Sequence, residues 1–172
     1  MLQTDRLAIF DVDGTLADNY ERVEKFLNKK PKDYDGYYAN VLDDPPIKIM
    51  CDLLCSMYVS GEFDIQVWTS RRMDCQTQTI KWLKEYCAPF TIEPLMDNRA
   101  RTSVSHNVGL RMRPMEGGNK EPDYKLKGRW LACVRDWYGY TDILAFDDRQ
   151  RVVDMYDQAG IRVLQPATGG DF

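Results

Sequence analysis

The 172-residue chain predicts an α/β fold in which a parallel sheet lies between layers of helices. Apolar runs without alternation, typical of strands buried on both faces, recur along the chain, and stretches with helical spacing of apolar residues separate them. In two places such a run passes directly into a pair of acids. Carboxylates are therefore expected at the carboxyl edge of the sheet, where open α/β sheets bind their ligands.

Length and composition narrow the class of protein. A chain of 172 residues with 44% apolar content is expected to form one domain, residues 1–172, with a real core. No apolar run is long enough to span a membrane, and the residues after Met1 show no signal-peptide pattern, so we expect no membrane partner. Five Cys without a Cys-x-x-Cys pair indicate neither a disulfide framework nor a zinc site, and favour a reducing cytoplasm.

The charge of the chain is unevenly distributed. A net charge of −4 excludes a generally basic nucleic-acid binder. The window from Arg99 to Arg129 nevertheless carries +5, which leaves −9 for the rest of the chain. Two interpretations stay open for this window: a basic face that meets phosphates, and a merely solvated loop.

The first predicted strand and the turn after it form the main candidate site. Leu7–Phe10 is a continuous apolar run, and Asp11 and Asp13 follow it, with Gly14 permitting a tight turn. Two adjacent carboxylates repel each other unless a cation or a shared proton relieves them, so the pair indicates a divalent metal, acid/base chemistry or both. A calcium loop is set aside because Gly stands fourth rather than sixth. A plain surface turn is the other alternative.

The next part of the chain is expected to form a small insertion and then a helix. Residues 19–44 are polar and rich in Tyr, and a short helix is predicted at Glu21–Asn28. Pro45 and Pro46 are expected to open a longer helix, with Asp44 as its N-cap and Gly61 at its end.

Hydroxyl and guanidinium groups follow the second predicted strand, Phe63–Trp68. Thr69 and Ser70 come next, and a hydroxyl at such a strand end can donate a hydrogen bond to a phosphoryl oxygen. Alternatively, it can cap the following helix, which is expected at about residues 73–86. Arg71 stands beside them and could grip a phosphate through two parallel hydrogen bonds.

The second half of the chain repeats the pattern of strand and helix. Residues 88–108 are expected to be an extra loop. Asp147 and Asp148 follow an apolar run directly, as Asp11 and Asp13 do. The remaining expected elements, in order, are a strand at Leu110–Pro114, a helix around Trp130–Trp137, a strand at Ile143–Phe146, a helix at Gln150–Ala159 and a strand at Ile161–Leu164.

The stretch Asp11-Val12-Asp13-Gly14-Thr15-Leu16 resembles the first motif of the haloacid dehalogenase (HAD) superfamily in its phosphatase form. Within that superfamily the chain is most similar to the 3′-phosphatase domain of phage polynucleotide kinase/phosphatase, over most of its length up to the closing Gly-Asp-Phe. The resemblance implies a HAD-like sheet with the strand order 3-2-1-4-5, which makes the acids after strands 1 and 4 neighbours.

The resemblance also implies roles for single residues. Asp11 is the expected nucleophile and Asp13 the expected general acid and base. Thr69 matches the second motif, and Lys127 matches the third, with Lys125 as the alternative lysine. The expected substrate-binding residues are Arg22, Ser70, Arg71, Arg113 and Asp123. The expected Mg²⁺ ligands are Asp11, the Asp13 backbone carbonyl and Asp147, with Asp148 acting through water.

The implied activity is Mg²⁺-dependent phosphomonoester hydrolysis through an aspartyl-phosphate. The preferred substrates are 3′-phosphorylated DNA or RNA ends. A 5′-nucleotidase acting on free mononucleotides and an inactive HAD-like module that docks a partner are the alternatives. The sequence holds no Gly-x-x-x-x-Gly-Lys-[Ser/Thr] motif, so a kinase or ligase would be a separate partner. The expected location is the cytoplasm, or the host cytoplasm if the chain is phage-encoded.

Overall fold

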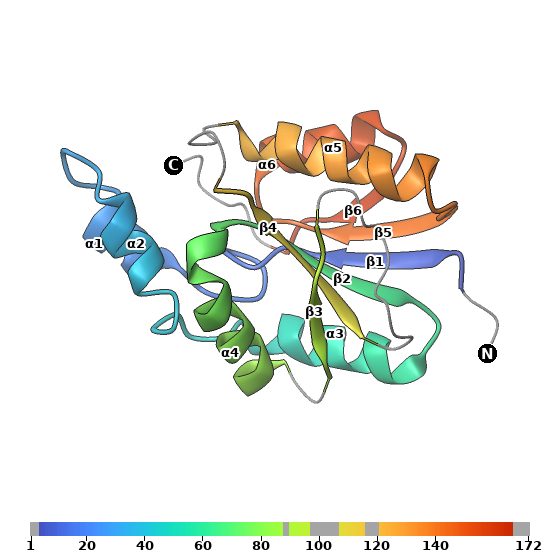
Figure 1. Ribbon diagram of the computed structural model, residues 1–172, viewed down its shortest axis with the longest axis horizontal. Coiled ribbons are helices and arrows are strands. Elements are labelled where there is room, and N and C mark those ends of the chain that lie inside the picture. Colours follow the sequence, from blue (N-terminus) through green and yellow to red (C-terminus); the bar gives the residue numbers. More distant parts are fainter. Residues whose placement is uncertain (1–3, 88–89, 97–106, 116–120, 167–172) are drawn as a thin grey trace.

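Six parallel strands form a single sheet in the order β3-β4-β2-β1-β5-β6 (Figure 1). The computed structural model describes residues 4–87, 90–96, 107–115 and 121–166. The strands are β1 (Arg6–Phe10), β2 (Asp64–Arg72), β3 (Ile92–Pro94), β4 (Val108–Arg113), β5 (Asp142–Phe146) and β6 (Arg162–Leu164).

The predicted parallel α/β fold is confirmed, with one addition to the sheet. The five strands expected from the sequence take the order implied by the resemblance, with β1 between β2 and β5. The sixth strand, β3, pairs with β4 at the sheet edge and falls within the stretch that was expected to be an extra loop. Residues 88–89 and 97–106 of that stretch lie outside the described residues.

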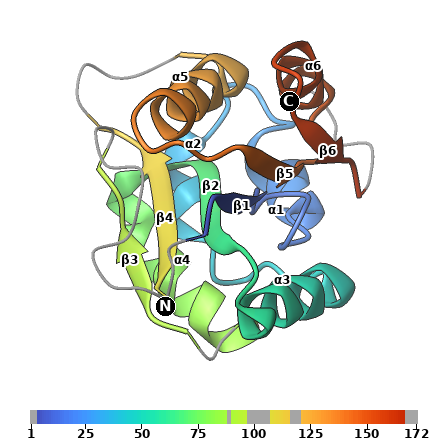
Figure 2. The same ribbon diagram turned by 90° about the vertical axis from the view of Figure 1, so that its right-hand side faces the viewer.

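Helices cover both faces of the sheet (Figure 2). The helical elements are α1 (Tyr20–Phe26), α2 (Tyr34–Ala39), α3 (Lys48–Ser60), the 3-10 turn η1 (Met73–Cys75), α4 (Gln76–Tyr86), α5 (Asp123–Asp136) and α6 (Gln150–Gln158). Helices α3 and α4 lie on one face, and α5 and α6 lie on the other. None of the helices in the described ranges is long and apolar enough to cross a membrane.

The alternation of side chains along β1 assigns its residues to the two layers. Ala8 and Phe10 belong to the apolar cluster that includes residues of α3 and α4. Leu7 and Ile9 belong to the cluster formed with α5 and α6. All four are buried, because the strand is covered on both faces, and this is why the apolar run shows no alternation.

The insertion between β1 and α3 has a small apolar cluster of its own. It consists of Val23, Phe26, Leu27 and Tyr37, from α1, α2 and the residue after α1. The two helices lie beyond the carboxyl end of β1, on the left in Figure 1. This position places them over the edge of the sheet where ligands of parallel sheets bind.

Several element boundaries differ from the prediction. Strand β2 continues to Arg72, so Thr69 and Arg71 lie within the strand instead of after it. Helix α3 begins at Lys48 with Ile47 at its N-cap, so the prediction of Asp44 as the cap was wrong. Helix α5 begins at Asp123, well before the stretch around Trp130 that was expected to be helical.

Candidate active site

Asp11 and Asp13 stand where the apolar run of β1 ends, as predicted. The backbone N–H of Asp11 donates to the carbonyl of Phe146, 2.9 Å away, which fixes the end of β1 against β5. Both carboxylates are buried, at 6% and 7% relative exposure. Gly14 follows at a φ of +90°, and a Cβ there would lie 2.1 Å from Oδ2 of Asp148. Glycine thus allows the turn and leaves room for Asp148.

Lys127 joins the acids at the ends of β1 and β5. Its Nζ donates to Oδ1 of Asp11 at 2.5 Å and to Oδ2 of Asp147 at 2.6 Å. Burial alone would lower the pKa of Lys127, but the charges of Asp11 and Asp147 raise it above its ordinary value, so the ammonium stays charged. Lys125 is exposed. Of the two lysines considered from the sequence, Lys127 is therefore the one that reaches the carboxylates.

Three carboxylates meet at this edge of the sheet and could hold a cation. Oxygen atoms of Asp11, Asp147 and Asp148 lie within 4.8 Å of one another. Oδ1 of Asp148 is buried and has no hydrogen-bond partner among the residues that the structure describes. Burial, followed by the neighbouring Asp147, raises the pKa of Asp148 to about 7. An oxygen-only set with one unpartnered buried carboxylate oxygen fits Mg²⁺.

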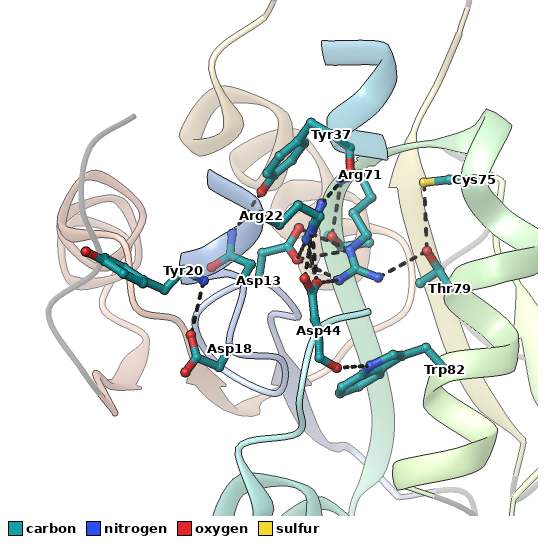
Figure 3. A network of polar contacts seen from close by, with 12 residues as sticks. Asp13, Asp18, Tyr20, Arg22, Tyr37, Asp44, Arg71, Cys75, Thr79 and Trp82 are labelled. Carbon is teal, nitrogen blue, oxygen red and sulfur yellow. Dashed lines mark hydrogen bonds and ion pairs between the residues drawn. The ribbon is translucent and has the colours of Figure 1, made fainter. Parts of the chain in front are cut away.

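Two buried arginines hold the carboxylate of Asp13 (Figure 3). Nη2 of Arg22 lies 2.5 Å and Nη2 of Arg71 lies 2.6 Å from Oδ1 of Asp13. Nε of Arg71 is 3.1 Å from each oxygen of the same carboxylate. Although burial opposes ionisation, the charges of Arg22 and Arg71 keep the pKa of Asp13 below its ordinary value. Asp13 is thus an anion in this arrangement.

A second buried carboxylate, Asp44, completes the group of four charges. Nε of Arg22 donates to its Oδ1 at 2.8 Å, and Nη2 of Arg71 donates to its Oδ2 at 2.9 Å. Nε1 of Trp82 in α4 donates to the backbone carbonyl of Asp44 at 2.8 Å. Two guanidinium groups face two carboxylates, so the group is neutral as a whole, which is how buried charges are tolerated.

Aromatic and amide groups position Arg22 from the side of the insertion. The guanidinium of Arg22 lies over the ring of Tyr37, with its central carbon 3.9 Å from the ring centroid, and its Nη1 donates to the Tyr37 carbonyl at 3.1 Å. The side-chain amide of Asn19 donates to the hydroxyl of Tyr37 at 2.8 Å. Arg22 is therefore held by α2 while it contacts Asp13.

Thr69 and Ser70 are placed differently from each other. Thr69 is buried, and its hydroxyl accepts a hydrogen bond from the backbone N–H of Arg71 at 3.2 Å. The backbone carbonyl of Ser70 accepts from Nε of Arg113 at 3.2 Å. Nη1 of Arg113 donates to the carbonyl of Glu121 at 2.7 Å, so Arg113 ties the end of β2 to the segment before α5.

Asp123 lies in the first turn of α5, four residues before Lys127. Its Oδ2 forms an ion pair with Nη1 of Arg149 at 2.5 Å. Burial opposes ionisation of Asp123, but the charges of Arg149 and Lys127 keep its pKa below the ordinary value. The backbone N–H of Arg149 also donates to Oδ1 of Asp147 at 3.1 Å. Asp123 and Arg149 together fix the start of α5 beside the residues that follow β5.

The basic window proposed from the sequence does not form one exposed face in the described part of the chain. Arg111 and Lys127 are buried. Arg129 is exposed and pairs with Glu121 at 3.0 Å. Arg99, Arg101 and Lys120 lie outside the described residues.

Sequence reasoning missed two residues of the site, Asp44 and Arg149. Asp44 precedes two prolines and was interpreted as a helix cap, whereas its carboxylate lies between Arg22 and Arg71. Arg149 directly follows Asp147 and Asp148, and no role was predicted for it, whereas it pairs with Asp123. The signal that could have found Asp44 is the excess of cations around Asp13, because two buried guanidinium groups need more than one carboxylate.

Comparison with known proteins identifies the family of the chain. A family model of the polynucleotide kinase PNKP phosphatase domain matches residues 5–172. Compared with curated proteins, the sequence matches none of them.

Solved structures share the fold. A chain of the Pnkp1/Rnl/Hen1 RNA repair complex superposes with a TM-score of 0.64 at 19% identity, over 97% of this chain and 43% of that one. A chain of a second structure of the Pnkp1/Rnl/Hen1 complex superposes with a TM-score of 0.65 at 17% identity, over 99% of this chain and 48% of that one. This chain therefore spans less than half of either relative. A hydrolase from Streptococcus pneumoniae TIGR4 superposes with a TM-score of 0.55 at 16% identity, over 92% of this chain and 90% of that one.

The identities with these solved structures are low, so the superpositions show the common fold alone. The family model, in contrast, covers nearly the whole chain, residues 5–172. The resemblance inferred from the first motif is thereby confirmed. The chain belongs to the polynucleotide kinase PNKP phosphatase domain family and is a phosphatase of the HAD type.

Proposed function

We propose that this phosphatase removes 3′-phosphates from DNA or RNA ends through an aspartyl-phosphate on Asp11. The observation that carries the proposal is the junction of Lys127 with Asp11 and Asp147 at the carboxyl edge of the sheet, with Asp13 two residues away. A carboxylate nucleophile, a second carboxyl group for proton transfer and a fixed cation are the groups that phosphoryl transfer through a covalent intermediate needs.

In the first step, a carboxylate oxygen of Asp11 forms a bond to phosphorus, and the bond from phosphorus to the leaving sugar oxygen breaks. Asp13 gives a proton to that oxygen as it leaves. Lys127 and the hydroxyl of Thr69 offset the negative charge on the phosphoryl oxygens. The ion pair with Lys127 also keeps the carboxylate of Asp11 in one orientation.

In the second step, a water molecule attacks the phosphorus of the aspartyl-phosphate. Asp13 accepts the proton of that water, and the bond between phosphorus and Asp11 breaks. Inorganic phosphate leaves, the carboxylate of Asp11 is free again, and Asp13 again carries the proton with which the first step began.

Asp11, Asp147 and Asp148 are the side chains that would hold Mg²⁺. A divalent cation at these oxygens adds positive charge that orients the phosphate and reduces its repulsion by Asp11. Lys127 supplies a fixed charge on the same carboxylates, so part of the neutralisation belongs to the chain itself.

The two arginines connect substrate binding to the protonation of Asp13. Asp13 must carry a proton to act as an acid, but Arg22 and Arg71 stabilise its ionised form. A phosphate dianion is a bidentate partner for a guanidinium and competes with Asp13 for both of them. We infer that the arginines turn toward the phosphate on binding, which raises the pKa of Asp13 when a proton is needed.

The choice of a nucleic-acid end as substrate rests on the family and on the small size of the insertion. The insertion consists of only two short helices, α1 and α2, and we infer from its small size that a polymer end can approach the site. The similar Pnkp1 chain works in an RNA repair complex with Rnl and Hen1. We propose by analogy that a separate kinase or ligase acts on the ends that this phosphatase produces.

The test is one panel of substrates measured with the same enzyme preparation. It contains 3′-phosphorylated oligonucleotides of increasing length, the 5′-phosphorylated forms of the same sequences, free mononucleotides and p-nitrophenyl phosphate. The highest kcat/KM is expected on the 3′-phosphorylated oligomers. Fastest hydrolysis of free 5′-mononucleotides, with no gain from length, would instead assign the chain to the nucleotidases.

The covalent step has its own test. Asp11→Asn is nearly isosteric but a very poor nucleophile, so it should abolish turnover of the whole panel while the folded signal in circular dichroism stays. Rapid acid quenching of the unmodified enzyme during turnover should trap phosphate on the protein. Substantial turnover by purified Asp11→Asn contradicts the aspartyl-phosphate.

A further inference from the structure

A small cavity beside the arginine pair is not used by the proposed chemistry. It has a volume of ≈ 180 Å³ and lies between helix α2 of the insertion and the segment after β2. Its lining comes from Asp35, Tyr38 and Ala39 of α2, from Arg72 at the end of β2, and from Asp74, Cys75 and Gln78 after it. It is smaller than the ~300–1,000 Å³ pockets of drug-sized ligands, so it suits one ring system.

Two residues of the cavity lining are chain neighbours of residues in the arginine network. Arg72 follows Arg71, the residue whose guanidinium contacts Asp13. Nη1 of Arg71 also approaches the hydroxyl of Thr79, one residue after Gln78. Burial and then the charge of Asp13 raise the pKa of Tyr38.

The charges around the cavity disfavour a second phosphate there. Arg72 is already held from two sides: Nη1 lies 2.9 Å from Asp35, and Nη2 lies 2.5 Å from Asp74. One cation between two carboxylates leaves the charged part of the lining with a net charge of −1. An anionic group would therefore be repelled, whereas a neutral group with N–H donors would be attracted.

The surfaces of the cavity suit a flat aromatic ligand. The central guanidinium carbon of Arg72 lies over the Tyr38 ring, 4.7 Å from its centroid, so the wall offers a cation–π pair of two planar groups. Gln78, Asp35 and Asp74 offer oxygen acceptors around them. Stacking on aromatic or guanidinium planes, together with hydrogen bonds to amino groups, is how proteins bind unpaired bases.

We propose that this cavity is the subsite for the nucleobase of the nucleotide that carries the scissile phosphate. The proposal rests on the proposed phosphatase activity toward nucleotide substrates and adds the base as a recognised group. With the phosphate near Asp11 and Asp13, the sugar would lie on the side of Arg71, and the base would enter between α2 and α4. The subsite then favours nucleotide phosphates over phosphate esters that lack a base.

The experiment compares a nucleoside 3′-monophosphate with the matching abasic sugar 3′-phosphate. For the unmodified enzyme, kcat/KM should be roughly tenfold or more higher on the nucleotide, the size expected when one base stacks. Gln78→Trp fills the cavity with an indole, so this ratio should fall close to one, mainly through KM of the nucleotide.

Thr77→Trp is the matched control, because Thr77 is exposed, adjacent to Gln78 and outside the lining of the cavity. It should keep the ratio of the unmodified enzyme. A ratio near one in the unmodified enzyme, or an equal change on both substrates in Gln78→Trp, overturns the subsite. Both results still leave a working phosphatase, so they do not touch the proposed function.

A complete lack of turnover on every substrate would count against the proposed function instead. Calorimetric titration of the protein with a nucleoside 3′-monophosphate then decides the subsite by itself. Binding that Gln78→Trp weakens and Thr77→Trp preserves supports it, and binding that the two variants change alike overturns it.

Discussion

Arg71 of β2 contacts Asp13 with two of its nitrogens, Nη2 at 2.6 Å and Nε at 3.1 Å from Oδ1, although 58 residues separate the two in the sequence. The side chain of Arg71 has no surface exposed to solvent. A residue that the resemblance assigned to the substrate thus holds the expected proton donor.

Asp44 should be a positioning residue for both arginines. In Asp44→Asn the amide keeps the shape but removes a charge, so Arg22 and Arg71 should turn more fully toward Asp13 and stabilise its anion. A misplacement of this kind costs roughly 10²-fold in rate. The loss of kcat should be larger on a nucleotide than on p-nitrophenyl phosphate, whose leaving group needs little protonation. Asp43→Asn, at the exposed neighbouring position, is the control and should match the unmodified enzyme.

Asp13→Asn should impair hydrolysis in proportion to the need for a proton. Substrates with poor leaving groups should lose roughly 10²–10⁴-fold in kcat, the range of general acid catalysis, and p-nitrophenyl phosphate should lose less. The slope of log kcat against leaving-group pKa therefore steepens in the variant. An equal loss on all leaving groups would contradict the role of Asp13 as a proton donor.

Lys127→Gln should affect both stability and activity. Removing the ammonium leaves Asp11 and Asp147 buried without their cation, which costs about 3–5 kcal/mol when one partner of a buried pair is lost. Lys125→Gln is the control, because Lys125 is exposed and should change the free energy of unfolding by less than about 0.5 kcal/mol. Urea unfolding of both variants, followed by kcat on p-nitrophenyl phosphate, measures the two effects.

Gly14→Ala should be more harmful than Gly61→Ala. Both glycines have positive φ, +90° and +67°, so each substitution costs about 1–2 kcal/mol in backbone conformation. Only Gly14 has a carboxylate in the way, since its added Cβ would lie 2.1 Å from Oδ2 of Asp148, and nothing lies within 4 Å at Gly61. Activity titrated with Mg²⁺ should show a raised metal requirement in Gly14→Ala alone.

Mg²⁺ should raise the midpoint of thermal unfolding, because a ligand that binds only the folded state stabilises it. Chelator should abolish turnover.

Asp147→Ala should raise the Mg²⁺ concentration needed for half-maximal activity more than Asp148→Ala, since Asp147 also orients Lys127. Identical responses of the two variants would contradict a direct role for Asp147 and a water-mediated one for Asp148.

The sheet could be predicted largely because its central strands are covered on both faces. Leu7–Phe10 and Ile143–Phe146 are apolar runs that end in acids, and the structure has strands at both places. Strand β3 escaped prediction because its three residues include a proline and no apolar run. The extension of β2 through Thr69 to Arg72 escaped because these residues are polar, although pairing with β4 still holds them in the sheet.

Site residues that stand in a local sequence pattern could be predicted, whereas contacts between residues far apart in the sequence could not. Asp11, Asp13, Asp147 and Asp148 were found because strand ends show in the sequence. The contact of Arg22 and Arg71 with Asp13, and the place of Asp44 between them, depend on how the insertion folds back over the sheet. The spacing of these residues in the sequence does not show that the insertion folds back over the sheet.

The apolar cluster of α1 and α2 has a practical consequence for the study of this enzyme. The two helices pack on each other, and Arg22 of α1 ties them to Asp13 through a buried ion pair. An anion that draws Arg22 away from Asp13 should change how firmly the two helices are held, so the rate at which the backbone amides of α1 and α2 exchange with solvent should change as well. Deuterium uptake in this pair of helices thus serves as a built-in reporter of ligand arrival, readable without turnover, dye or label.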